Sequence, residues 1–577
     1  MIRILRIERR KLVRQKSLLA DIALLFIVLG TLYAIARVGA GMMVAFNPPN
    51  TMPAIDLNPA NLPYYAARST LRMFLGLGIS LAFTLSYGYI AAKNHKLERI
   101  MIPLLDILQS VPVFGYLAVT VTAFIALFPG SLLGLECAAI FAIFTGQAWN
   151  MTFAFYHSLI TLPKELDEAT RLFRLNKFQR FAKLEVPAAM IPLVWNAMMS
   201  FGGGWFFVSA SEAISVLKKG YSLPGLGSYV AKAVDQKNLM AVGYAVITIV
   251  LVIVIVDQLF WRPLVAWAEK FKLEKSASAV VPSSWLYDIL KSSSLPKMAA
   301  QLLERQAAWL RRVLPKPRTN RPIQFKKQRP NWGDTIYGLV IGVVLCIAAI
   351  TGYRFITSEV SLREVLTCLG LGGLTFLRVV LLVALSTLIW TPIGVAIGFQ
   401  PKLARFMQPL VLLFASFPAN FLFPLAAILF LRIHLTLNIG SMFLMALGTQ
   451  WYILFNVIAG AMQVPTDLRE MAINMRLSRQ IMWKRLIIPA IFPAWVTGAI
   501  TASGGAWNAS VVSEVITWGN DKLEANGLGS YITRATQSED WPRIVLGVAM
   551  MCIFVVTVNR LVWRRLYTVA ESRYKLA

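Results

Sequence analysis

Long apolar runs recur along almost the whole chain, and they restrict its fold more than any other feature of the sequence. Each run has about 20 residues or more, the length that an α-helix needs to cross the hydrocarbon core of a bilayer. Of the 577 residues only 15% are charged, whereas soluble domains average about 25%. The sequence therefore predicts an all-α polytopic membrane protein with twelve spans. The predicted spans are 18–45, 66–92, 101–128, 132–160, 188–216, 238–266, 334–357, 365–399, 407–431, 437–462, 490–517 and 542–566.

The positive charges lie between these runs. The net charge is +29, with seven cations and one acid in residues 1–16 and fifteen cations against four acids in 262–333. The loop 47–64 has no Lys or Arg. Because cytoplasmic loops of membrane proteins are enriched in Lys and Arg, we expect both termini and the basic loops to be cytoplasmic. The charge is thus explained by topology and contact with membrane lipid, and no nucleic-acid partner is expected.

The chain contains an internal duplication. A shift of 302 residues aligns Glu168 with Glu470, and "GLGSY" at 225–229 with the same letters at 527–531; upstream, a shift of 306 aligns Arg72 with Arg378. Each copy has six predicted spans, an even number, so both copies have the same orientation. Such parallel repeats are related by a pseudo-two-fold axis along the membrane normal, which places a pathway between them.

The duplication divides the chain into three parts. Residues 1–268 form the first half, 334–577 form the second half, and 269–333 form a basic linker. We expect the linker to be a cytoplasmic tether, with a regulatory or docking contact as the alternative. The first span is expected to be retained rather than cleaved as a signal peptide, because a matching span opens the second half.

Several classes of chemistry lack the residues that they need. The four cysteines and three histidines show no metal-ligand spacing. No G-x-x-x-x-G-K-[ST] phosphate-binding loop occurs, so the chain is not expected to hydrolyse ATP. We therefore expect no catalytic residue, no metal site and no bound cofactor.

A charged segment interrupts the apolar pattern once in each half, at 163–187 and 465–489. The first segment predicts a short amphipathic helix with Leu166, Ala169 and Phe173 on one face, and the second repeats the pattern with Leu468, Met471 and Met475. Acids precede cations in each, which suits the helix dipole. From physics alone, such a helix fits either a groove on another protein or a lipid surface.

The spacing of these segments resembles a known motif. Each has E-A-x or its equivalent, with Pro nineteen residues after Glu, as in the EAA loop of permease subunits of ATP-binding-cassette (ABC) importers. "GGGWFFVSASEAI" at 202–214 and the twin "GLGSY" stretches look like the nitrate, sulfonate, taurine and bicarbonate branch. The resemblance covers about 66–268 and 365–577. The motif residues in this chain are Glu168, Ala169, Arg171, Phe173, Arg174, Pro187, Glu470, Met471, Met475, Arg476 and Pro489.

The resemblance implies a fused permease of the bacterial inner membrane that carries a small anion-like solute. It also implies partners: two copies of a cytoplasmic ABC ATPase that receive the two loops, and an extracytoplasmic solute-binding protein. In one respect the chain departs from the family, because Arg174 and Arg476 occupy the position six residues after Glu where the family usually has Gly. We therefore expect a more continuous helix through each loop.

Duplicated polar and aromatic residues within the spans are candidates for the translocation pathway or a gate. Glu212 and Glu514 either line a gate or hydrogen-bond to the neighbouring "GLGSY" stretch. Arg72 and Arg378 either meet an anion in transit or snorkel to the interface. Trp205 and Trp507 either line the path or pack within the protein.

The sequence leaves one other function open. Parallel duplicated halves also build secondary transporters driven by an ion gradient, and Glu212 and Glu514 are compatible with such a mechanism. The two charged loops favour the importer. The sequence does not identify the solute.

Overall fold

The computed structural model describes residues 54–111, 113–216, 219–271, 284–293, 354–519 and 521–573, with parts of 21–45 and residues 347 and 350–352. The chain divides into two compact units. The larger, here called the core unit, comprises Gly41–Val254 and Gly352–Ala577 and therefore holds most of both halves. The smaller comprises Met1–Ala40 and Ile255–Thr351.

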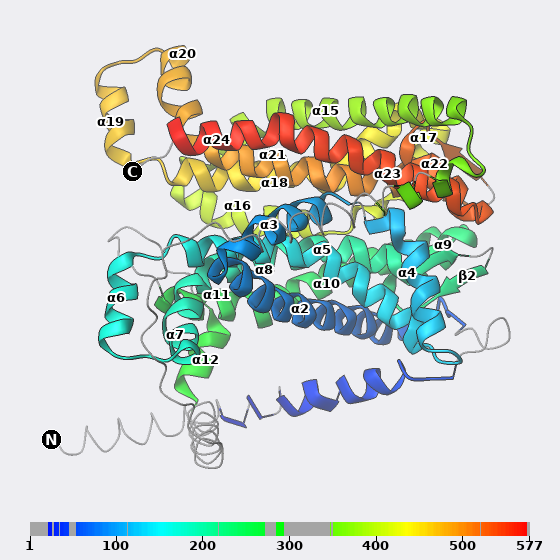
Figure 1. The fold of residues 1–577 in the computed structure, drawn as a ribbon, viewed down its shortest axis with the longest axis horizontal. Coiled ribbons are helices and arrows are strands. Elements are labelled where there is room, and N and C mark those ends of the chain that lie inside the picture. Colours follow the sequence, from blue (N-terminus) through cyan, green and yellow to red (C-terminus); the bar gives the residue numbers. More distant parts are fainter. Residues whose placement is uncertain are drawn as a thin grey trace. The chain divides into compact units, whose positions relative to one another are not determined.

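The two halves repeat the same order of elements (Figure 1). The first contains α2 (Leu62–Lys93), α3 (His95–Ser110), α4 (Val113–Leu127), α5 (Leu133–Ile160), α6 (Lys164–Leu172), α7 (Lys177–Arg180), α8 (Val186–Glu212), β1 (Ala213–Val216), β2 (Lys219–Ser222), α9 (Leu226–Asp235) and α10 (Leu239–Val256). The second contains α15 (Leu362–Gly398), α16 (Pro401–Ser416), α17 (Phe423–Arg432), α18 (Leu437–Met462), α19 (Thr466–Asn474), α20 (Arg479–Met482), α21 (Ile488–Ser513), β3 (Val515–Trp518), β4 (Asp521–Glu524), α22 (Leu528–Ser538), α23 (Trp541–Val558) and α24 (Arg564–Arg573). The duplication seen in the sequence is therefore a duplication of structure.

The described residues contain fewer spans than the twelve predicted. Seven helices are long and apolar enough to cross a membrane, or eight if the bent pair Pro401–Ser416 and Ala419–Arg432 is counted as one span. The predicted span 334–357 lies mostly outside the described residues. In the predicted span 18–45, the described part forms an apolar helix at Val28–Ala40.

The third predicted span of each half is broken in two, and a proline explains both breaks. Val111 precedes Pro112 and has the extended angles φ −80° and ψ 120°. Phe417 precedes Pro418 and is also extended, with φ −70° and ψ 126°. The proline ring excludes the residue before it from the helical region. In the second half the two helices meet at 75°.

Close helix packing builds the core of each half. In the first half α5 packs between α2 and α8, and in the second α18 packs between α15 and α21. Small residues permit the close approach: a Cβ at Gly498 would lie only 2.9 Å from the carbonyl oxygen of Tyr452. This is the packing expected between helices in a membrane, where lipid is as apolar as the side chains.

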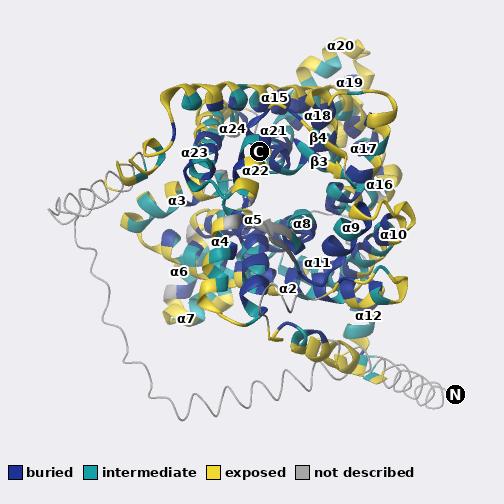
Figure 2. Ribbon diagram, turned by 90° about the vertical axis from the view of Figure 1, so that its right-hand side faces the viewer, coloured by how far each residue is buried: buried dark blue, intermediate teal, exposed yellow. Residues whose placement is uncertain are grey.

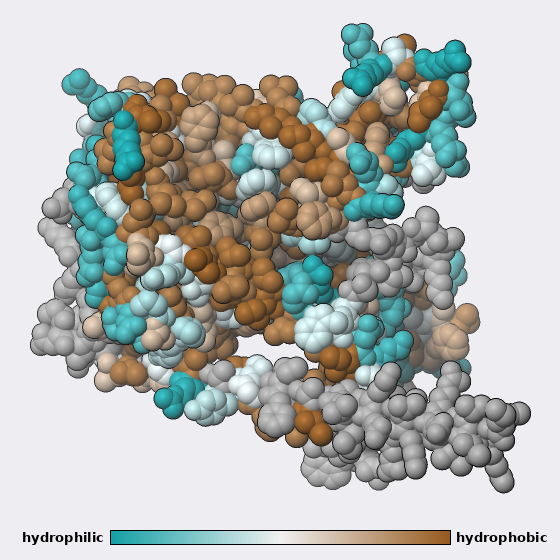
Figure 3. Space-filling model, turned by 180° about the vertical axis from the view of Figure 1, so that it is seen from behind, coloured by the Kyte–Doolittle hydropathy of each residue, from teal (hydrophilic) through white to brown (hydrophobic). Residues whose placement is uncertain are grey.

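The outward faces of these helices are apolar. Figure 3 shows a broad hydrophobic surface on the rear face, between hydrophilic side chains at the left edge and at the upper right. On α15, leucines at 366, 377 and 388 are 61%, 53% and 72% exposed. Exposed leucines in such a band are stable only against lipid, so this surface supports a multi-pass membrane protein.

A β-hairpin follows α8 and another follows α21. β1 pairs antiparallel with β2, with Ala213 opposite Ser222, and β3 pairs with β4, with Val515 opposite Glu524. The second hairpin reaches the first half, because the Gly519 amide donates to the Val234 carbonyl at 3.1 Å. The C-terminal ends of α8 and α21 therefore lie at the same end of the core unit.

The smaller unit includes part of the linker. Residues 285–292 form α12 (Trp285–Ser292), which Ser284 caps through the Tyr287 amide. The Ser293 hydroxyl donates to the Asp21 carboxylate, so the start of the linker contacts the N-terminal segment. Residues 272–283 and 294–333 of the linker lie outside the described residues, and the tether role stays a prediction.

Candidate functional site

The charged loops form two projecting pegs, defined here as residues 163–187 (first peg) and 465–489 (second peg). Each consists of a nine-residue helix, a turn and a second short helix that continues through a π-helical turn into α8 or α21. Side chains start the second helices: Asn176 accepts from the Gln179 amide at 2.7 Å, and Ser478 accepts from the Ile481 amide at 3.4 Å. Each peg is therefore continuous with a helix of the membrane core.

The predicted continuous helix through each peg is wrong. Arg174 and Arg476 have φ of 50° and 49°, in the left-handed region. The Leu175 amide donates to Thr170 and the Leu477 amide donates to Ala472, both at 3.1 Å, which is the bond that closes a Schellman turn at a helix end. The turn that Gly provides in the family is kept, although a side chain there costs about 1–2 kcal/mol.

Large apolar side chains on both pegs face solvent. Leu172, Phe173 and Phe178 of the first peg are 83%, 78% and 75% exposed. Met471 and Met475 of the second are 52% and 65% exposed. Figure 2 shows α6, α7 and α19 largely in the exposed and intermediate colours. Apolar groups so exposed mark a contact with another protein or with a membrane surface, the two alternatives that the sequence left open.

The remaining motif residues of the two pegs differ in their exposure. Glu168, Arg174, Glu470 and Arg476 are exposed. Ala169, Pro187 and Pro489 are half-buried. The side chain of Arg171 lies outside the described part of the structure.

Both pegs lie at one end of the core unit. They adjoin the N-terminal ends of α8 and α21, whereas the hairpins adjoin the C-terminal ends, and Figure 1 shows the pegs on the left and β2 and α22 on the right. A single layer of partner subunits can therefore contact both.

Different residues anchor the two pegs. Glu185, buried at the base of the first peg, pairs with Lys93 at 2.6 Å and Arg180 at 2.8 Å, tying the peg to the end of α2. The second peg is tied to α15 by Arg469, which donates to the Phe399 carbonyl at 3.0 Å. Sequence reasoning missed these anchors, since the 302-residue shift pairs Glu185 with Ile487 and so hides their common role.

Replacing Glu185 with Ala is expected to loosen the first peg. The change removes a buried carboxylate between two cations and should cost about 1–3 kcal/mol of stability, because Lys93 and Arg180 stay partly hydrated. The measurement is the rate of tryptic cleavage within residues 163–187. Glu185→Gln, which keeps the shape, should show a smaller increase, and unchanged cleavage in both variants would show that this anchor is unimportant.

Glu212 lies in a buried cluster beside the "GLGSY" stretch of the first half. Its Oε1 pairs with Arg72 at 2.6 Å and accepts from Ser69 at 2.6 Å, and its Oε2 accepts from the Gly227 amide at 2.7 Å. The Ser69 hydroxyl also accepts from the Leu226 amide at 3.0 Å. The carboxylate thus caps the N-terminus of α9, a favourable place for negative charge.

Glu514 forms the same cluster in the second half. Its Oε1 pairs with Arg378 at 2.9 Å and accepts from Thr375 at 2.8 Å. Its Oε2 accepts from the amides of Gly529 at 2.8 Å and Ser530 at 3.2 Å. Of the two alternatives from the sequence, the hydrogen bond to the "GLGSY" stretch is therefore present in both halves.

The first cluster contains a second ion pair that the other half lacks. Arg72 contacts Glu136 at 2.5 Å, and Glu136 also pairs with Arg68. The repeat pairs Arg68 with Leu374 and Glu136 with Asn438. Arg72 is 0% exposed and Arg378 8%, so the predicted snorkelling to the interface is wrong for both.

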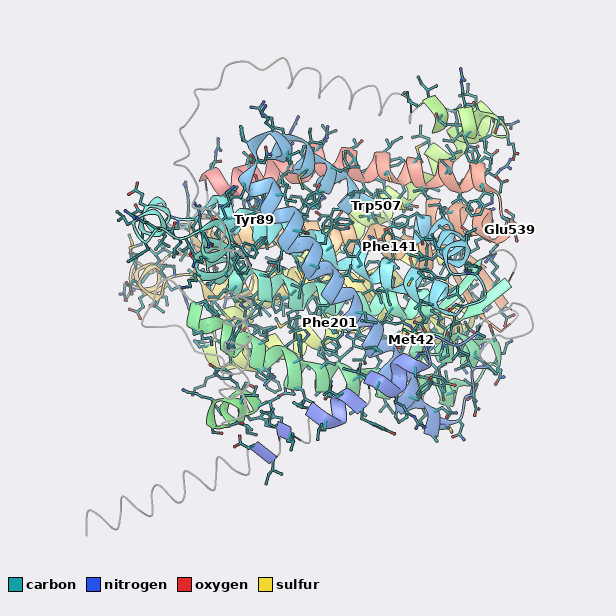
Figure 4. The ribbon with its side chains drawn as sticks, turned by 60° about the horizontal axis from the view of Figure 1, so that its bottom comes forward. Met42, Tyr89, Phe141, Phe201, Trp507 and Glu539 are labelled. Carbon is teal, nitrogen blue, oxygen red and sulfur yellow. The ribbon has the colours of Figure 1, made fainter. Side chains whose placement is uncertain are left out.

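Trp205 and Trp507 are buried at 1% exposure each. The Trp205 ring meets Phe201 edge-on at 5.9 Å between centroids, and Trp507 packs on Phe554 at 6.1 Å. Figure 4 labels Phe201 and Trp507, which lie among the packed helices. Both tryptophans therefore pack within the protein, which is the second of the two roles that the sequence left open for them.

Two cavities lie between the halves. The smaller, about 70 Å³, is bordered by α8, α16, α18 and α21, and the larger, about 450 Å³, is bordered by α8, α9, α21 and α22. Hydrogen bonds between Ser209 and Asn420, at 2.9 and 3.1 Å, lie at the larger cavity. Polar lining comes from Tyr452 and Asn508 in the smaller and from Asp235 in the larger.

The lining of these two cavities has no Lys or Arg among the described residues. It also includes none of the six candidate pathway residues. Phe206 and Asn508, which directly follow the two tryptophans in sequence, line the smaller cavity instead. The pathway role of Glu212, Glu514, Trp205, Trp507, Arg72 and Arg378 stays a prediction that the geometry of these cavities does not support.

Comparison with known proteins gives the family. Residues 84–260 and 389–576 each match the family described as "Binding-protein-dependent transport system inner membrane component". The chain belongs to this family. Each match falls in one half, so the duplication is a duplication of the whole family domain, and ABC permeases of this kind are non-catalytic membrane components.

Individual relatives are distant. The bicarbonate transport system permease protein CmpB of Synechocystis sp. is 28% identical over 166 residues, which are 29% of this chain and 56% of CmpB. The nitrate import permease protein NrtB of Leptolyngbya laminosa is 24% identical over 170 residues, 30% of this chain and 57% of NrtB. The glycine betaine transport system permease protein OpuAB of Bacillus subtilis is 28% identical over 181 residues, 31% of this chain and 59% of OpuAB. The chain spans less than two thirds of the length of the relatives it matches.

Proposed function

We propose that this chain is the permease component of an ATP-driven importer, with its two halves forming one translocation pathway. The observation that carries the proposal is the pair of pegs at one end of the core unit, each exposing large apolar side chains. Phe173 and Met475 enter grooves on two copies of a cytoplasmic ABC ATPase. This proposal sets the orientation: the pegs and both termini are cytoplasmic, and the hairpin end faces the solute-binding protein.

The geometry supplies a route for mechanical work. Each peg continues into α8 or α21, and both helices border the two cavities. When the ATPases close on ATP, the pegs move together and rotate α8 and α21 about their contacts. The rotation separates the hairpin ends, where Ser209 and Asn420 join the halves, and opens the larger cavity to the binding protein.

The cargo in this proposal is a small solute with an anionic group, of the bicarbonate, nitrate, sulfonate or taurine type. Support comes from the bicarbonate and nitrate permeases among the relatives, while the glycine betaine permease extends the class to a zwitterion. Since neither cavity presents a Lys or Arg, such a solute is held by neutral donors such as Tyr452 and Asn508.

Capture of an ATPase tests the function directly. The chain is expressed with an ABC ATPase subunit from the same organism and purified in detergent; we expect two ATPase copies per chain and solute transport that requires ATP. Transport into proteoliposomes driven by an ion gradient without ATP would instead support the secondary transporter. The ion pairs that hold Glu212 and Glu514 leave no free carboxylate there for ion coupling.

A further inference from the structure

Arg174 and Arg476, the turn residues of the two pegs, extend the proposed function, and their role rests on it. We propose that Arg174 and Arg476 are the specificity-determining cations of the pegs and pair with acidic side chains at the rim of each ATPase groove. The partner surface is thus assigned a chemistry: an apolar groove for Phe173 or Met475, with a carboxylate beside it.

The first argument is conformational. Gly adopts the left-handed region without a steric penalty, and the family position is one where Gly fits. Both copies of this chain nevertheless place Arg there, at φ 50° and 49°. A side chain that is unfavourable for the backbone and recurs in both copies is explained most simply by an interaction of the side chain itself.

Within the described part of the chain, the guanidinium groups of Arg174 and Arg476 have no partner. Both residues are exposed, and neither side chain has an ion pair or hydrogen bond in the described part of the protein. Each stands directly beside the exposed apolar residue that enters the groove, Phe173 or Met475. A cation in this place meets the rim of the groove, where charge complementarity selects the partner.

Another pair of equivalent turn residues provides an internal comparison. Lys237 and Glu539, which the 302-residue shift aligns, also have left-handed φ, of 52° and 62°. Their charges are opposite, so that turn does not itself require a cation. Where the partner lies within the chain it is visible: Lys237 pairs with Asp521 of the other half at 3.0 Å. Arg174 and Arg476, in contrast, carry the same charge. We infer that they meet identical partners, which are two copies of one ATPase.

The test uses the full-length chain in detergent and the separately purified ABC ATPase subunit that it captures. The double variant Arg174→Gly/Arg476→Gly removes both cations and keeps the left-handed turn. The double variant Arg174→Lys/Arg476→Lys keeps the charge. The matched control is His434→Gly/Glu539→Gly, which makes the same backbone change at two left-handed helix ends away from the pegs.

We expect the Gly/Gly variant to bind the ATPase about five- to tenfold more weakly at low salt and to lose most of the salt dependence of binding, as is typical of rim charges. The Lys/Lys variant should keep most of the affinity, and the control should match the wild type. The inference would be overturned if the Gly/Gly variant lost stability but bound the ATPase with unchanged affinity and salt dependence. The guanidinium would then act only on its own helix end. Failure of the wild-type chain to bind the ATPase would instead contradict the proposed function.

Discussion

The double variant Phe173→Asp/Met475→Asp is expected to bind the ATPase at least about 100-fold more weakly and to lose ATP-dependent transport. Each change puts a carboxylate into an apolar groove, and an unpaired buried charge costs several kcal/mol. The free permease should fold normally, because these side chains are 78% and 65% exposed. Size-exclusion chromatography and ATPase capture measure the two properties separately.

Trp285→Asp provides the control for this prediction. Trp285 is a 53% exposed aromatic residue on α12 of the linker, so the chemical change is the same but the place is not a peg. If the Trp285→Asp variant captures the ATPase normally, the result supports the linker as a tether. Full capture by the Phe173/Met475 variant would show that the pegs are not the docking site, and reduced capture by Trp285→Asp would assign the linker a docking role.

The second large effect is expected from Glu212→Ala, which leaves Arg72 paired with Glu136 alone, and from Glu514→Ala, which removes the carboxylate that pairs with Arg378. Breaking a buried ion pair in this way costs about 3–5 kcal/mol, and each variant also loses hydrogen bonds from the first amides of α9 or α22. We expect strongly reduced amounts of folded protein and a lower melting temperature in detergent. Glu212→Gln, which keeps some of the hydrogen bonds, should lose less.

The outcome separates the two roles that the sequence left open for these residues. A gate residue would leave stability intact and change only transport, whereas a structural residue would change stability first. Asp235→Asn is the control, because burial already raises the pKa of Asp235 and no ion pair with it occurs in the described part of the chain. Normal stability in both Glu→Ala variants would exclude the structural role.

The two halves differ in the polar contacts that they make where they meet. Asn420 and Asn508 make contacts across the interface with Ser209 and with the Val113 amide. The repeat aligns Asn508 with Phe206, so that polar contact has no copy in the other half. A fused chain allows such one-sided contacts, because each half always meets the same partner.

By itself the sequence determined the duplication, the membrane class and the position of the two pegs, because apolar length, repeat spacing and motif spacing are local properties of the chain. It also contained the reason why the third predicted span of each half is broken: Pro112 and Pro418 stand within those spans and force Val111 and Phe417 out of the helix.

Only the tertiary structure decided how polar groups are paired. Arg68 and Glu136 are 68 positions apart, and Arg72 and Glu212 are 140 apart, so no pattern along the chain reveals that they meet. The turn at Arg174 and Arg476 was also decided by the folded chain, where backbone hydrogen bonds and the start of the next helix outweigh the preference of arginine for a right-handed conformation.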